Sequence, residues 1–112
     1  MIEEVRDLWS PGFDCRAITT NGFVRRDGAC VMGRGCALQA AQRWPSLPYL
    51  VGRHIRAHGN IPAVFLVGEE HVVTFPVKHR WMDPADTSLI VASAVAILGL
   101  ADSFGWVRVG VP

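Results

Sequence analysis

Residues 18–44 constrain the fold of this chain more than any other stretch, because three kinds of backbone follow one another there. Apolar and β-branched residues over 17–20 are typical of a buried strand, which Asn21 and Gly22 end. Glycines at 33 and 35 predict a tight loop whose backbone approaches a ligand closely. Apolar residues then recur with helical spacing from about Gly35, and the free N–H groups at such a helix start favour an anion, often a phosphate.

The loop alone leaves two interpretations open. Small residues between a strand and a helix form a purely structural turn in many α/β domains, and the same loop can hold a phosphate. Two common phosphate-binding patterns are excluded. The segment Gly33-Arg34-Gly35 lacks the third glycine of G-x-G-x-x-G, and no Gly-Lys-Ser/Thr follows it.

Two ordered blocks give the chain a resemblance to a known family. The first reads Thr-Thr-Asn-Gly over 19–22, followed by Val-Met-Gly-Arg-Gly-Cys-Ala-Leu-Gln over 31–39. The second reads Thr-Phe-Pro-Val-Lys-His-Arg-Trp over 74–81. Together they resemble macrodomains, in the branch that contains terminal ADP-ribose glycohydrolases and the antitoxin that removes ADP-ribose from DNA. The resemblance covers nearly the whole chain, but not the whole family domain.

The resemblance implies a role for individual residues. Asp7 and Leu8 would contact adenine, and Asn21 would contact the distal ribose. The backbone of 32–36 would hold the phosphates. Trp81 would either form a wall of the cleft or only pack against other side chains. Lys78 matches the branch's catalytic lysine, which engages the anomeric carbon of the distal ribose. The predicted ligand-binding residues are Asp7, Leu8, Asn21, Met32, Gly33, Arg34, Gly35, Cys36 and Trp81, and the predicted catalytic residue is Lys78.

The residues by themselves allow plainer interpretations, and the sequence also departs from the family. Without the resemblance, Asp7 is a solvated strand-end carboxylate and Lys78 a surface lysine. Arg6 stands where the family has the Gly of its adenine-site Gly-Asp motif, and the loop over 23–30 is longer than usual. The chain stops at Pro112, before the family's second phosphate loop, catalytic acidic residue and last helix. We therefore expect an incomplete single domain, 1–112, whose uncovered last strand favours self-association.

Two functional hypotheses follow from the resemblance. The chain either hydrolyses ADP-ribose from modified protein carboxylates or nucleic-acid bases, or it is a non-catalytic ADP-ribose-binding module or inactive remnant. For hydrolysis, a lysine in a partly desolvated site beside Arg80 and His79 is expected to be nucleophilic. The expected partners are ADP-ribose and ADP-ribosylated protein or nucleic acid, with no membrane, cofactor or metal.

Composition narrows the class of protein. Of the 112 residues, 50% are hydrophobic and 19% charged, which predicts a globular domain. A net charge of +1 gives no general attraction to nucleic acid, although arginines gather at 25, 26 and 34. Three cysteines without C-x-x-C spacing indicate a reducing, cytoplasmic compartment. The acidic N-terminus does not resemble a signal peptide, and the apolar run 89–101 is too short to cross a bilayer.

The predicted elements follow one another in the order β-β-α-α-β-β-α-β. Strands are expected at 4–9, 15–21, 63–67, 72–75 and 106–111. Helices are expected at 35–43, from a Ser46 cap to Gly59, and from an Asp83 cap to about 103. This order predicts an α/β, macrodomain-like mixed sheet flanked by helices, with Asn21, Gly33 and Lys78 converging at strand ends. His54 and His58 have the i, i+4 spacing of a zinc pair but no third ligand, which favours packed histidines.

Overall fold

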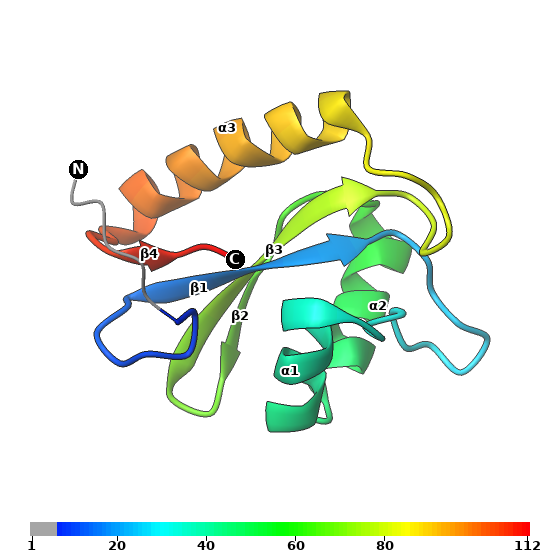
Figure 1. Ribbon diagram of the computed structural model, residues 1–112, viewed down its shortest axis with the longest axis horizontal. Helices are drawn as coiled ribbons and strands as arrows, with labels where there is room; N and C mark the ends of the chain where they lie inside the picture. Colours follow the sequence, from blue (N-terminus) through cyan, green and yellow to red (C-terminus); the bar gives the residue numbers. More distant parts are fainter. Residues whose placement is uncertain (1–6) are drawn as a thin grey trace.

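The computed structural model describes residues 7–112, which form a four-stranded mixed sheet between helices (Figure 1). The strands lie in the order β2-β3-β1-β4, and their bounds are β1 Cys15–Asn21, β2 Val64–Val67, β3 Glu70–Lys78 and β4 Val109–Gly110. The helices are α1 Gly35–Arg43, α2 Leu47–His58 and α3 Thr87–Phe104. In Figure 1, α3 covers one face of the sheet, and α1 and α2 lie over the other. The predicted α/β sheet flanked by helices is therefore confirmed.

β1 is one of the two inner strands of the sheet, and its side chains face both layers. Ile18 packs in the core beneath α1 and α2, whereas Cys15 and Ala17 pack with Ile97 beneath α3. β1 runs parallel to β3 and to β4, and β3 pairs antiparallel with β2. Burial raises the pKa of the Cys15 thiol to about 12, so this residue is an inert core side chain.

Arg16 is a buried charge that joins three parts of the fold. Its Nη1 lies 2.6 Å from Glu70 Oε1, at the start of β3. Its Nε donates to the carbonyl of Leu8 at 2.9 Å, and its Nη2 donates to the carbonyl of Ser10 at 2.8 Å. A buried guanidinium is tolerated because ion-pair and hydrogen-bond partners offset its desolvation. Arg16 thus ties the N-terminal turn and the β2–β3 hairpin to β1.

Asp14 holds the last strand beside β1. Its Oδ2 accepts hydrogen bonds from the N–H groups of Val107 at 2.8 Å and Arg108 at 2.9 Å. These hydrogen bonds, that of Arg108 first, lower the pKa of the Asp14 carboxyl. The strand expected at 106–111 is only Val109–Gly110 in the structure, since the preceding backbone bonds to Asp14 instead of a ladder.

The β3 strand is longer than predicted, because Pro76 does not interrupt it. The N–H of Thr74 bonds to the carbonyl of Ala63, on the β2 side. Because backbone direction alternates along a strand, the nitrogen of Pro76 also faces the β2 side. β2 begins beside Val73 and does not reach Pro76, so the missing N–H of this proline costs no hydrogen bond of the sheet. Lys78 is therefore the last residue of β3 and does not lie past its end.

Three helix and strand starts also differ from the prediction. Of the strand expected at 4–9, residues 4–6 lie outside the described residues, and the rest forms a turn closed by Ser10 N–H to Asp7 O at 3.0 Å. α3 begins at Thr87, capped by Asp86, because Asp83 is paired with Arg80 instead. Ser46 makes no side-chain cap hydrogen bond, since its backbone is already helical.

We predict that Gly52 cannot carry a side chain. A Cβ at this position of α2 would lie 1.9 Å from the carbonyl oxygen of Gly28, in the loop that precedes α1. Gly52→Ala should lower the free energy of unfolding by about 1–3 kcal/mol or more, because the loop must move away. Urea unfolding measures this loss. The control is Arg53→Ala on the exposed side of α2, which should stay within about 0.5 kcal/mol of the parent. Equal effects would contradict the prediction.

Candidate functional site

A cavity of about 660 Å³ opens where the parallel strands β1 and β3 end. Its wall comes from the last residues of both strands, from the segment 31–34 before α1 and from the first turn of α1. Phe23, Arg25 and Trp81 complete it. Ligands of open α/β sheets bind at this edge, outside the carboxyl ends of the strands. The volume lies within the about 300–1,000 Å³ that is usual for small-molecule sites.

A register shift between β1 and β3 shapes the floor of the cavity. Thr20 pairs with Pro76, but Asn21 pairs with Lys78, so Val77 is an extra residue in β3. Because side chains alternate along a strand, one extra residue changes the direction of those that follow it. Val77 and Lys78 both line the cavity as a result. The shift sets Lys78 directly beside Asn21.

The backbone of Lys78 is held by its neighbours. Its carbonyl accepts from Gly22 N–H at 3.1 Å and from Asn60 Nδ2 at 3.0 Å. Asn60 Nδ2 also lies 3.3 Å from Nδ1 of His79. A Cβ on Gly22 would lie 2.8 Å from Cγ of Asn60 and 3.0 Å from the carbonyl oxygen of His79, so any larger residue would displace the Asn60 side chain.

Asn21 braces the loop that precedes α1. Its Nδ2 donates to the carbonyl of Val31 at 2.9 Å, and its Oδ1 accepts from Phe23 N–H at 2.9 Å. Cys30 lies under the same loop, 3.5 Å from the carbonyl of Asn21, and burial raises the pKa of its thiol to about 11. Asn21 therefore shapes the cavity as well as lining it.

The electrostatics of the cavity favour an anion. Arg25, Arg34 and Lys78 line it, and no Asp or Glu does so among residues 7–112. α1 starts at Gly35, at the cavity wall, and has no acidic side chain in its first turn. The first N–H groups of a helix have no hydrogen-bond partner within the helix. Together with the positive end of the helix dipole, they form a site that favours an anion.

The structure brings together seven of the ten residues that the sequence predicted for the site. The cavity is lined by Asn21, Met32, Gly33, Arg34, Gly35, Lys78 and Trp81. They come from β1, from the loop before α1 and its first residue, from the end of β3 and from the loop after β3. Trp81, with 47% of its surface exposed, lines the cavity and does not pack in the core.

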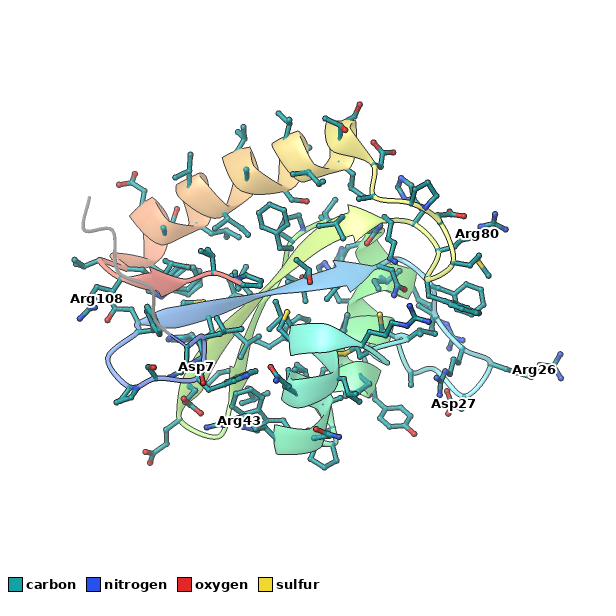
Figure 2. All side chains as sticks on the ribbon, in the orientation of Figure 1. Asp7, Arg26, Asp27, Arg43, Arg80 and Arg108 are labelled. Atoms are coloured by element: carbon teal, nitrogen blue, oxygen red, sulfur yellow. The ribbon has the colours of Figure 1, made fainter. Side chains whose placement is uncertain are left out.

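Three predicted residues do not line this cavity. Leu8 is a core residue, and Cys36 Sγ lies 3.4 Å from Thr19 Oγ1. Asp7 is exposed, with its Oδ1 accepting from Trp9 N–H at 3.0 Å. In Figure 2, Asp7 lies at the opposite end of the sheet from the loops that carry Arg26 and Arg80. The adenine and phosphate roles of these three residues stay predictions.

Neighbours expected to act on Lys78 are engaged elsewhere. The guanidinium of Arg80 pairs with the Asp83 carboxylate at 3.2 Å, and His79 Nε2 lies 3.9 Å from Asp86 Oδ2. Neither residue lines the cavity. Arg25 lines the cavity instead. The sequence marked it only as one of the clustered arginines and not as a site residue.

The sequence also did not predict two other kinds of site residue. Asn60 holds the Lys78 backbone from outside the cavity, and the further lining residues are Thr19, Thr20, Phe23, Val31, Ala37 and Val77. Phe23 follows Asn21 closely and had a local signal, its position just after a predicted strand end. Asn60 lies between α2 and β2, far from Lys78 in sequence, and no motif marks it.

Of the paired histidines of α2, His54 packs against the sheet, and His58 is exposed beside it. The rings of His54 and His58 are 5.0 Å apart between centroids, and His54 meets Phe65 edge-on. Burial, and then the charge of His58, lowers the pKa of His54. Among residues 7–112, no three His, Cys, Asp or Glu side chains are grouped to hold a metal ion.

Comparison with solved structures identifies the fold. The macrodomain of Mycobacterium tuberculosis DarG matches with a TM-score of 0.81 and 23% identity, over 97% of this chain and 72% of that one. The macrodomain of Thermus aquaticus DarG matches with a TM-score of 0.78 and 18% identity, over 96% of this chain and 72% of that one. Thermosipho africanus DarTG in complex with ADP-ribose matches with a TM-score of 0.71 and 17% identity, over 89% of this chain and 29% of that one.

No family model and no curated protein matches the sequence. The structural matches nevertheless show that the chain has the macrodomain fold, as its two sequence blocks predicted.

We predict that Gly22 and Asn60 are energetically coupled. Gly22→Ala should destabilise the protein by about 1–3 kcal/mol, because the new methyl group meets the Asn60 side chain. In an Asn60→Ala background, the same substitution should cost less, since the two contacts at 2.8 Å are removed and only the His79 carbonyl oxygen at 3.0 Å stays close. A double-mutant cycle measured by urea unfolding gives the coupling. Additive costs would mean that Asn60 does not fill this space.

Proposed function

We propose that this chain binds ADP-ribose in the cavity at the ends of β1 and β3. The observation that carries the proposal is the combination of cavity size, three lining cations and the α1 N-terminus at its wall. A diphosphate carries two negative charges, which Arg25, Arg34 and the first N–H groups of α1 are suited to hold. A structural neighbour, Thermosipho africanus DarTG, was solved in complex with ADP-ribose, which supports this choice of ligand.

The same cavity supports hydrolysis as the chemical step. Lys78 lines the cavity beside Asn21, where the distal ribose would lie. Its Nζ would attack the anomeric carbon of that ribose while the bond to a carboxylate oxygen or base nitrogen breaks. The leaving group keeps the bonding electrons and takes up a proton, and water then releases ADP-ribose from the lysine. Modified protein carboxylates and nucleic-acid bases present the same ADP-ribose group, so both are proposed substrates.

A second candidate is an ADP-ribose-binding module without turnover. One observation favours it, namely that no carboxylate lines the cavity among the described residues. Loss of a general acid or base typically lowers a rate by about 10²–10⁴-fold. Binding and turnover are therefore separate tests.

We predict that ADP-ribose stabilises the folded chain. At 100 times its Kd, a ligand that binds only the folded state adds about 2.7 kcal/mol, which raises the melting midpoint by several degrees. Arg34→Glu should raise the Kd at least about tenfold, because it places a like charge beside the phosphates. Arg80→Glu makes the same charge change outside the cavity and is the matched control. No shift in a cooperatively folded sample would contradict the proposal.

We predict that turnover, where it occurs, depends on the amino group of Lys78. Lys78→Ala should reduce release of ADP-ribose from a modified protein or oligonucleotide by at least about 100-fold. Lys78→Arg keeps the positive charge and should retain ADP-ribose affinity, yet lose turnover. Normal turnover by Lys78→Arg would exclude Lys78 as the nucleophile. Binding without turnover by the parent chain would select the second candidate.

A further inference from the structure

The outer side of α3 is apolar and uncovered within residues 7–112. Among its residues, only Ser93 and Ile97 are buried. Val91, Val95 and Leu98 recur at i, i+4 and i+7, with 58%, 65% and 71% of their surface exposed. Figure 1 shows no other element over this side. We call this surface the outer α3 face, and its residues are Ser88, Val91, Ala92, Val95, Leu98, Gly99 and Asp102, all exposed.

A membrane is a poor occupant for the outer α3 face. The sequence predicts that the apolar run 89–101 is too short to cross one, but α3 extends beyond this run. By length and composition, α3 alone among the described helices would suffice, with a mean hydropathy of 1.8 over 18 residues. However, α3 lies along the sheet, where Ser93 Oγ donates to the carbonyl of Pro76 at 2.8 Å. Helices that rest on membranes carry Lys or Arg on their polar face. The one charged residue of α3 is Asp102, which anionic headgroups repel.

We propose that a second copy of this chain covers the outer α3 face, with the two α3 helices antiparallel about a two-fold axis at Val95. The face is complementary to itself in this arrangement. In such a pair, a residue that precedes Val95 by a given number of positions faces the partner residue that follows Val95 by the same number. Val91 therefore faces the partner's Gly99, and Leu98 faces the partner's Ala92. Each large side chain therefore meets a small one, which lets the helix axes approach to about 8 Å.

The charge at the end of α3 points to the same arrangement. Asp102 lies in the last turn of its own helix, where the negative end of the helix dipole opposes it. In the antiparallel pair, Asp102 lies opposite the partner's Ser88, in the first turn of the partner's α3. The turn itself holds no acidic residue, and its dipole favours a carboxylate, with Asp86 before it already capping Leu89 N–H at 3.2 Å. Each copy thus places its acidic side chain at the correct end of the other helix.

The size of the face sets the expected strength of the dimer. A helix of 18 residues is about 27 Å long and about 10 Å wide. Such a face is smaller than the about 800 Å² per partner of a standard interface. We therefore expect a reversible dimer. The sequence predicts self-association at the last strand instead, but β4 has two residues and offers far less apolar surface than α3.

The first test is molar mass as a function of concentration, by sedimentation equilibrium. The parent chain should pass from one copy to two as concentration rises. Val95→Asp sets two carboxylates at the axis and should raise the dimer Kd at least about tenfold. Val107→Asp, at a position 89% exposed outside the face, is the matched control and should leave the Kd unchanged. A monomer at every concentration, or equal weakening by both variants, would overturn the proposal.

The second test uses cross-linking to fix the orientation, in a Cys36→Ser background. The other two cysteines are buried, so a new surface cysteine reacts alone. Val95→Cys should form a disulfide-linked dimer on mild oxidation. Val91→Cys should do so at least about tenfold more slowly, because its two copies lie about 12 Å apart along the helices. Equal rates would exclude the antiparallel pair, as would a parent chain that stays monomeric in solution and sediments with phosphatidylglycerol vesicles.

Discussion

The parallel pairing of β1 with β3 is the interaction on which the rest of this structure depends. β1 precedes α1 and α2 in the chain and β3 follows them, so their ladder closes the first half of the molecule onto the second. The same ladder gives α3 a surface to cover, through Ile97 and the carbonyl of Pro76. Its one irregularity, the extra Val77, sets Lys78 beside Asn21. The site is thus a consequence of how the sheet is paired.

Contacts between α2 and the loop before α1 complete the cavity. The loop before α1 packs against α2. Gly52 leaves room for the Gly28 carbonyl, and Cys30 N–H donates to the carbonyl of Pro48 at 2.9 Å. Asn21 then fixes the two ends of this loop from inside. Because the loop is held in place, Arg25 and Arg34 face a cavity that exists before any ligand arrives. Such preorganisation lowers the entropy that binding must overcome.

The elements that the sequence predicted well are those with strong local signals. β1 and α1 have the expected bounds, and α2 ends at Gly59 as expected. The errors came from contacts between distant residues. Pro76 was expected to break β3, but β2 begins beside Val73 and does not reach the level of Pro76. Asp83 was expected to cap α3, but Arg80 binds it and Asp86 caps the helix instead. A secondary-structure propensity describes one residue by itself, whereas each of these outcomes depended on a neighbouring strand or side chain.

The sequence by itself determined the α/β class, the glycine loop before α1 and the convergence of Asn21, Gly33 and Lys78, because parallel strands end at the same edge of a sheet. Only the tertiary structure decided which cations line the cavity, since Arg25 does so while Arg80 is paired outside it. It also decided that Asp7 lies at the other end of the sheet and that Asn60 holds Lys78. Sequence spacing fixes where a strand ends, but the position of a side chain depends on residues far away in the chain.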